Sequence, residues 1–171
     1  GTVEDAMDLL YSSLHDPNPV LFFEHKKLYR SLKTHIPDKA NYEPLGKAKL
    51  RREGTDATII TYGMGIQWAL QIADEYEQKD ISLEILDLRT LLPLDKEAIR
   101  KTVQKTGKVL LLQEPSLTLG PLSEISAIIS EECFEWLDAP VMRCASLDTP
   151  IPHDKNLEHG FMADSNLEMK L

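Results

Sequence analysis

The clearest pattern of apolar and polar positions lies in residues 55–95, where two periods alternate. Residues 58–62 form a β-branched, apolar run, which is typical of a strand buried on both faces. Gly63 then allows a tight turn, and apolar residues recur at helical spacing within residues 66–76. A second apolar strand follows at residues 82–88. A strand, a crossover helix and a second strand predict a βαβ unit with parallel pairing.

The same alternation continues downstream. Asp95 can cap a helix that ends before Gly107, a residue type suited to the position after a helix. Further apolar runs predict a strand at 109–112, a helix at 122–137 and a strand at 139–145. The succession predicts the α/β class, with helices on both faces of the sheet.

The flanking segments are less regular. Residues 2–14 read as a helix that opens with a capping box, and residues 20–24 read as a short apolar strand. Residues 46–53 alternate and predict a half-exposed edge strand or hairpin arm. Residues 164–171 resemble the first turns of a last helix. We expect residues 1–17 to be the tail helix of a preceding domain, and residues 18–171 to be one domain, truncated before its C-terminal helix is complete.

Composition and charge narrow the partners. The chain has 171 residues, of which 42% are hydrophobic and 27% charged, as in ordinary soluble globular proteins. Its formal charge of −9 argues against nucleic acid or an anionic membrane as the main partner. No apolar run approaches the ~20 residues that a membrane-spanning helix needs. The two cysteines lack metal-ligand spacing and are expected to be buried thiols.

Candidate catalytic groups are few. Asp87 and Arg89 share one face of a strand near its end, where they form either a catalytic pair or a buried ion pair, and Glu114 can join them. The five histidines have no metal-binding spacing, and Tyr62-Gly63-Met64-Gly65 is not a dinucleotide fingerprint. We therefore predict no catalytic, cofactor-binding or metal-binding residue in this chain.

Two aromatic side chains are more informative. Phe134 falls outside the apolar stripe of the predicted helix 122–137, and Trp68 lies opposite the apolar face of its own helix. An aromatic residue in such a place is covered either by another segment of the chain or by a partner protein. Asp138 lies beside Phe134 and can offer a charge to a basic partner.

Several short motifs occur in an order and spacing that resemble a known family. They are PVLFFEHKKLYR at 19–30, PLGK at 44–47, REG at 52–54, TYG at 61–63, DLRTLLPLD at 87–95, KTGK at 105–108 and DAPV at 138–141. Together they resemble the C-terminal half of the beta subunit of the thiamine-diphosphate-dependent decarboxylase component of 2-oxo acid dehydrogenase complexes. The motifs match both the branched-chain 2-oxo acid type and the pyruvate type.

The resemblance implies a three-layer α/β/α domain of the transketolase C-terminal type, whose sheet is mostly parallel with one antiparallel edge. It implies an α2β2 assembly with an alpha subunit and a second beta subunit, located in the bacterial cytoplasm or the mitochondrial matrix. The whole enzyme uses thiamine diphosphate and magnesium, but the residues that bind them lie outside this chain, which alone is expected to be inactive and to bind neither.

The resemblance also implies a docking site for the subunit-binding domain of the dihydrolipoyl acyltransferase. In that family, docking uses an apolar residue late in a long helix and an acidic residue just before an Ala-Pro pair. These positions correspond to Phe134 and Asp138, and we expect Trp68 to lie at a subunit interface. The family's docking also involves the end of the beta chain, which this sequence does not reach in full.

Two alternatives stay open at this stage. The first is the C-terminal domain of a transketolase or of a deoxyxylulose-phosphate synthase, which shares the TYG and PLD stretches. The second is a free-standing flavodoxin-like binding module, which predicts a monomer with a ligand at the carboxyl ends of its strands.

Overall fold

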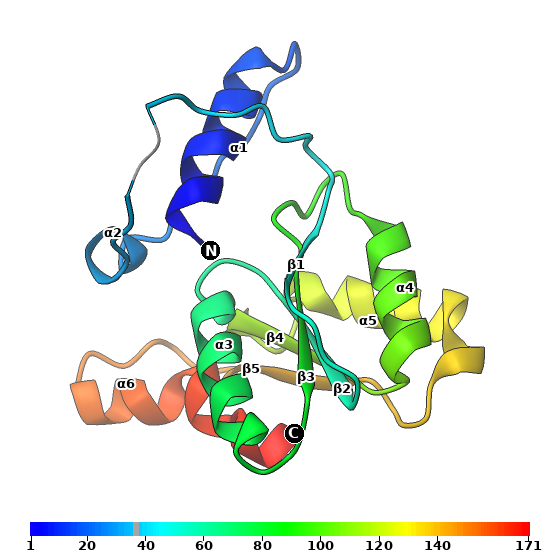
Figure 1. Cartoon of the computed structure of the whole chain (residues 1–171). Coiled ribbons are helices and arrows are strands. Elements are labelled where there is room, and N and C mark those ends of the chain that lie inside the picture. Colours follow the sequence, from blue (N-terminus) through cyan, green and yellow to red (C-terminus); the bar gives the residue numbers. More distant parts are fainter. Residues whose placement is uncertain (36–37) are drawn as a thin grey trace.

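The computed structural model describes residues 1–35 and 38–171, and a five-stranded sheet forms its centre (Figure 1). The strand order is β1-β3-β2-β4-β5. The pairs β2–β3, β2–β4 and β4–β5 are parallel, and β1 runs antiparallel beside β3 at the edge. The strands are β1 (Lys49–Arg52), β2 (Ala57–Thr61), β3 (Leu83–Asp87), β4 (Val109–Ser116) and β5 (Met142–Ser146). The expected sheet, mostly parallel with one antiparallel edge strand, is confirmed.

Helices cover both faces of this sheet and make the expected three layers (Figure 1). Neighbouring residues of a strand point to opposite faces, so Ile59 packs in one buried cluster and Ile60 in the other. The first cluster joins the sheet to α3 (Gly65–Glu77) and to the C-terminal turn η2 (Ala163–Asn166). The second joins it to α4 (Lys96–Thr106) and α5 (Pro121–Glu132).

Local sequence signals explain where the central helices begin and end. The Asp95 side chain accepts a hydrogen bond from the Ala98 N–H and caps α4, as predicted. Gly107 follows α4 with a positive φ of 63°, a conformation that glycine adopts without strain. Gly65 begins α3 so close to β2 that an added Cβ would lie 2.0 Å from the Thr61 hydroxyl oxygen. A larger residue there would force α3 away from the strand.

Three local predictions differ from the structure. Residues 20–24 form no strand and pair with none of the five strands in the described parts of the chain. The predicted helix 122–137 ends at Glu132, because Cys133 leaves the helical region, and the 3-10 turn η1 (Phe134–Trp136) follows. Residues 164–171 form the short turns η2 and η3 (Glu168–Lys170) rather than a helix, and α6 (Lys155–Phe161) was not predicted.

The N-terminal segment stands apart from the sheet (Figure 1). It contains α1 (Val3–His15) and the single turn α2 (Leu28–Ser31). Thr2 caps α1 by accepting from the Asp5 N–H, which agrees with the predicted capping box. No helix in the described residues is both long and apolar enough to cross a membrane.

Candidate functional site

A buried cluster of charged groups lies where β3 ends. Asp87, which is fully buried, accepts two hydrogen bonds from the Arg51 guanidinium, and Arg51 also pairs with Asp5 of α1. Arg89 pairs with Asp5 at 3.3 Å and with Glu43 at 2.8 Å. Of the two readings left open for Asp87 and Arg89, the structure gives a buried ionic cluster, which we call the clamp. It ties α1 and the segment before β1 to the sheet.

Glu114 lies apart from the clamp and has a different partner. Its carboxylate is 2.7 Å from Nε2 of His25, which comes from the segment between α1 and α2. Burial, and secondly the negative charge of Glu114, raise the pKa of Tyr62 to about 12. Glu114 therefore does not join Asp87 and Arg89. It fastens a loop to the carboxyl end of β4.

The cysteines and the glycine turn fit structural roles. Both cysteines are free and buried, as predicted. Burial raises the pKa of Cys144 to about 11, which makes its thiol a poor nucleophile at neutral pH. Gly63 has a positive φ of 58° in the turn between β2 and α3. Within residues 1–35 and 38–171, no group of three or more His, Cys, Asp or Glu side chains is arranged to hold a metal ion.

An open groove lies on the other side of the domain, between the end of α5 and the loop that enters β5. We call it the α5 groove. It is lined by Ser126, Ser130, Phe134, Leu137, Asp138, Ala139, Pro140 and Val141. Behind this groove, Ile129 and Cys133 are buried in the core cluster of α4 and α5. Because packed core residues support it, the groove exists before any partner binds.

Phe134 and Asp138 both lie in this groove. Phe134 is 74% exposed, because the turn η1 directs its side chain away from the core after α5 has ended. Asp138 is exposed, and its backbone N–H donates to the Gly107 carbonyl at 2.8 Å, which fixes it against the end of α4. The structure brings together the two residues that the sequence singled out for docking. That they bind a partner stays a prediction.

The segment that carries Phe134 and Asp138 is acidic. Residues 131–138 contain four carboxylates and no Lys or Arg. Glu132 pairs with Lys96 at 2.6 Å, whereas Glu131 and Glu135 are exposed. Exposed Phe134 and Asp138, set in an acidic segment, suit a ligand that offers apolar and basic groups together.

Trp68 is placed differently from what we expected. It is only 7% exposed and belongs to the buried cluster that contains Ala163 and Leu167. Of the two alternatives for its cover, the structure shows the first, another segment of the same chain, since the C-terminal segment returns to this face of the sheet. Sequence periodicity within one helix cannot reveal cover that comes from residues about ninety positions later. Its role at a subunit interface stays a prediction, for which only a small edge of the ring is available.

Comparisons with known proteins agree with this fold. The profile of the family described as "Transketolase, C-terminal domain" matches residues 46–166. The chain is 47% identical over 165 residues to the "2-oxoisovalerate dehydrogenase subunit beta" of Bacillus subtilis, covering 96% of this chain and 50% of that protein. It is 44% identical to the "Pyruvate dehydrogenase E1 component subunit beta" of the same organism, covering 89% of this chain and 47% of that protein.

A solved structure is also similar. It is described as "Split gene transketolase, inactive beta4 tetramer", and it aligns with a TM-score of 0.64 and 26% identity. The alignment covers 80% of this chain and 43% of that chain. The present chain spans about half the length of the curated relatives it matches. The matched profile covers most of the sheet and its helices, and the chain belongs to the transketolase C-terminal domain family.

Proposed function

We propose that this chain is the subunit-assembly and acyltransferase-docking domain of a thiamine-dependent 2-oxo acid dehydrogenase. The whole enzyme would decarboxylate a branched-chain 2-oxo acid or pyruvate and reductively acylate lipoyl groups. The observation that carries the docking role is the α5 groove, which exposed Phe134 and Asp138 line together. The similarity to beta subunits of 2-oxoisovalerate and pyruvate dehydrogenases supports the enzyme class. It favours this reading over a transketolase-type enzyme, whose solved relative is 26% identical.

We assign no catalytic step to these residues. The charged groups at the strand ends are engaged in the clamp and in the His25–Glu114 pair. In the described parts of the chain, no group of three or more His, Cys, Asp or Glu side chains is arranged to hold a metal ion. The chemistry would belong to the part of the enzyme that this chain does not span. The same engagement of the strand ends gives little support to a flavodoxin-like binding module.

The domain boundary is part of the proposal. The family profile starts at residue 46, which leaves α1 and α2 outside it. Leu10, Tyr11 and Leu14 of α1 are exposed, and an apolar side of this kind suits packing against another domain. Residues 1–17 would be the tail helix of a preceding domain. The assembly would be α2β2, in the bacterial cytoplasm or the mitochondrial matrix.

Docking at the α5 groove would combine an apolar anchor with charge complementarity. The partner would insert an apolar group beside Phe134 and place a basic group near Asp138, whose backbone is already fixed. Removing such an anchor costs about 1–3 kcal/mol of binding free energy, which is roughly a 5- to 150-fold loss of affinity. Charge contacts at an exposed rim are screened by salt, so affinity would also fall as ionic strength rises.

The test is a calorimetric titration of the acyltransferase's subunit-binding domain into the assembled enzyme. Phe134→Ala and Asp138→Lys are each expected to weaken binding, and Asp138→Lys is expected to reduce the salt dependence. The matched control is Tyr42→Ala, which removes an aromatic side chain that is 66% exposed and lies outside the groove, and which is expected to leave this binding unchanged. Unaltered affinity in both groove variants would remove the docking role from this surface.

A further inference from the structure

Two glycines beside the central helices share one backbone conformation. Gly107 follows α4 with a φ of 63°, and Gly63 lies in the turn before α3 with a φ of 58°. This left-handed region favours glycine at both positions. Their surroundings differ, because a Cβ added to Gly63 would meet no atom within 4 Å, whereas a Cβ added to Gly107 would lie 2.5 Å from Oδ2 of Asp138. Gly107 therefore has a second reason to be glycine, which is the position of Asp138.

Asp138 meets Gly107 through both its backbone and its side chain. The Asp138 N–H donates to the Gly107 carbonyl at 2.8 Å, and the Asp138 carboxylate occupies the space where a side chain of residue 107 would begin. Gly107 is buried, while Asp138 is exposed. Within residues 1–35 and 38–171, the Asp138 carboxylate forms no ion pair. Its charge is therefore available to a basic group of another molecule.

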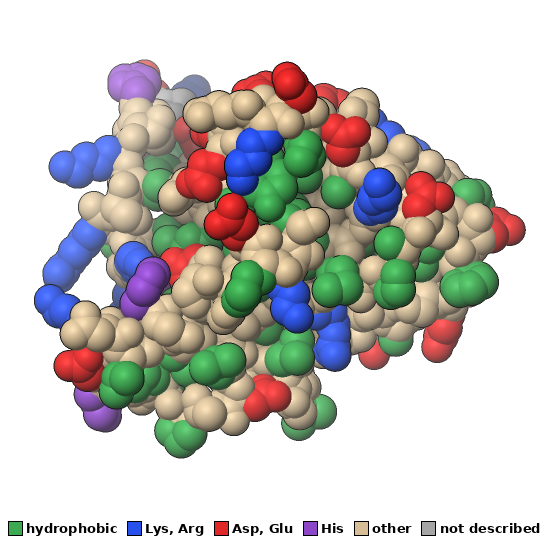
Figure 2. All heavy atoms as spheres, turned by 90° about the horizontal axis from the view of Figure 1, so that it is seen from below, with side chains coloured by type: hydrophobic (Ala, Val, Ile, Leu, Met, Phe, Trp, Pro, Cys, Tyr) green, Lys and Arg blue, Asp and Glu red, His purple; other side chains and the backbone are tan. Residues whose placement is uncertain are grey.

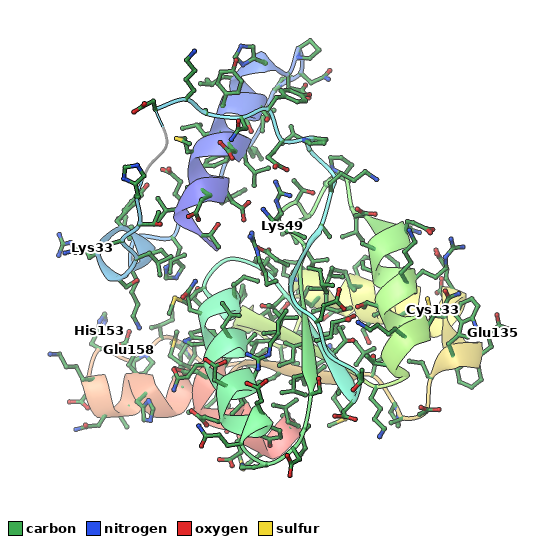
Figure 3. The ribbon with its side chains drawn as sticks, viewed as in Figure 1. Lys33, Lys49, Cys133, Glu135, His153 and Glu158 are labelled. Carbon is green, nitrogen blue, oxygen red and sulfur yellow. The ribbon has the colours of Figure 1, made fainter. Side chains whose placement is uncertain are left out.

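The turn that joins Phe134 to Asp138 is anchored on its inner side. Trp136 and Leu137 pack against the core cluster of α4 and α5, whereas Glu135 projects away from the body of the domain (Figure 3). At this end of the molecule, on the right in Figure 2, acidic and apolar side chains are both exposed. The separation between the Phe134 ring and the Asp138 charge thus depends on the turn η1 and on the end of α4, where Asp138 rests.

We propose that Gly107 is a positioning residue of the α5 groove: because it has no side chain, the Asp138 carboxylate lies where a basic group of the docking partner can reach it. This inference rests on the proposed docking role. Gly107 is not among the residues that line the groove, so it acts through Asp138. A Cβ at residue 107 would displace the carboxylate, since real Cβ atoms do not approach other heavy atoms within 3.0 Å. The exposed Asp138 side chain can rotate, so such a variant is expected to fold with this charge turned away.

The test uses asparagine, which adopts a positive φ more readily than most residues that carry a Cβ. Docking of the acyltransferase's subunit-binding domain to the assembled enzyme is measured by calorimetry at several salt concentrations. Gly107→Asn is expected to weaken docking roughly 3- to 10-fold, the size of one lost charge contact, and to reduce its salt dependence. The matched control is Gly63→Asn, which makes the same change at a similar φ but in open space, and is expected to dock like wild type.

A double-mutant cycle separates positioning from a general loss of structure. Asp138→Ala is expected to weaken docking, and the further change Gly107→Asn is expected to add no loss, because the carboxylate that Gly107 positions is gone. An effect that came only from strain at the end of α4 would be equally large with and without that carboxylate. Equal effects in the two backgrounds, or wild-type docking by Gly107→Asn, overturn this inference alone. Failure of the wild-type enzyme to dock counts against the proposed function and removes this inference with it.

A second variant leaves the turn after α4 untouched. Asp138→Glu keeps the negative charge but moves the carboxylate one methylene farther from its own backbone, so that it no longer fits against Gly107 in the same way. It is expected to weaken docking, whereas Glu131→Asp, at an exposed acid that does not line the groove, is expected to have no effect. Docking of Asp138→Glu with wild-type affinity overturns the inference, even if Gly107→Asn does not fold.

Discussion

The α5 groove and the segment at residues 19–35 both expose aromatic side chains beside charges, yet they are built in opposite ways. Because this segment carries four Lys and Arg residues and one Glu, we call it the basic arm. The groove lies on elements that belong to the packed core, with buried Ile129 and Cys133 behind it. The arm has no buried residue in α2 and is held by the His25–Glu114 pair and by Leu28. One surface is acidic and the other is basic.

The difference affects how much conformational entropy each surface would lose on binding a partner. A groove made of core elements loses little conformational freedom when a partner enters, so most of its contact energy appears as affinity. An arm with few tethers loses more conformational entropy on binding, and this loss reduces the binding free energy that its contacts supply. We therefore expect binding at the groove to depend mainly on one anchor residue.

The largest expected effect comes from breaking the clamp. Arg51→Met leaves the carboxylates of Asp5 and Asp87 buried without the guanidinium between them. Loss of one partner from a buried ionic cluster costs about 3–5 kcal/mol, to be measured by urea unfolding. The control Lys101→Met removes an exposed pair with Glu97 and is expected to cost less than about 1 kcal/mol. Equal losses in both variants would mean that the clamp does not hold α1 and the segment before β1 to the sheet.

A smaller loss of stability is expected at the start of α5. Gln113 is buried, donates to the Ser116 carbonyl at 2.7 Å and accepts from the Leu122 N–H at 2.9 Å. Gln113→Ala leaves that N–H buried and unpaired, which costs about 1–3 kcal/mol in urea unfolding. Docking at the α5 groove, measured well below the unfolding midpoint, is expected to stay unchanged. A loss of docking as large as that of Phe134→Ala would show that the groove is less firmly supported than its core contacts indicate.

The next effect appears only at high pH and concerns Tyr62, beside the attachment point of the arm. Burial raises its pKa from 10.0 to about 12. Between these values the unfolded chain releases a proton that the folded chain keeps, so stability falls as pH rises through this window. Tyr62→Phe is expected to remove this part of the pH dependence. An ultraviolet titration that finds all five tyrosines ionising together near pH 10 would contradict the assignment.

The smallest effect on stability is expected from His25→Ala. The His25–Glu114 pair is partly exposed, at 27% and 34% of the two side chains, so its loss costs less than about 1 kcal/mol. Its local effect is larger, because the arm loses one tether. Trypsin is expected to cut after Lys26 and Lys27 faster than in wild type, and Glu114→Gln is expected to act in the same direction. Unchanged cleavage in both variants would show that Leu28 alone positions the arm.

Sequence patterns predicted the centre of this domain well, because its signals are local. The runs at β2, β3 and β4 are rich in apolar residues, and Asp95 and Gly107 mark the ends of α4. Phe134 was found from helical spacing although the helix ends before it. To predict that Phe134 is exposed, it was enough to know the direction of its side chain relative to the neighbouring residues.

The features that sequence patterns missed all depend on segments distant in the chain. Trp68 is buried in a cluster that includes Ala163 and Leu167, and no pattern within α3 reports that cover. Arg51 was read only as part of an edge strand, whereas the fold places it between Asp5 and Asp87. The extended segment at 20–24 has apolar character but no strand to pair with in the described residues.

Asp95 carries a consequence for how the border of the sheet is protected. One of its oxygens accepts from the Ala98 N–H at the start of α4, and the other accepts from the Ala48 N–H just before β1 at 3.2 Å. The same carboxylate therefore nucleates a helix and sets where the outermost strand begins. An edge strand that is not held in place can pair with a strand of another molecule and so start aggregation. Substitution of Asp95 is therefore expected to cause aggregation during refolding before it changes what the domain binds.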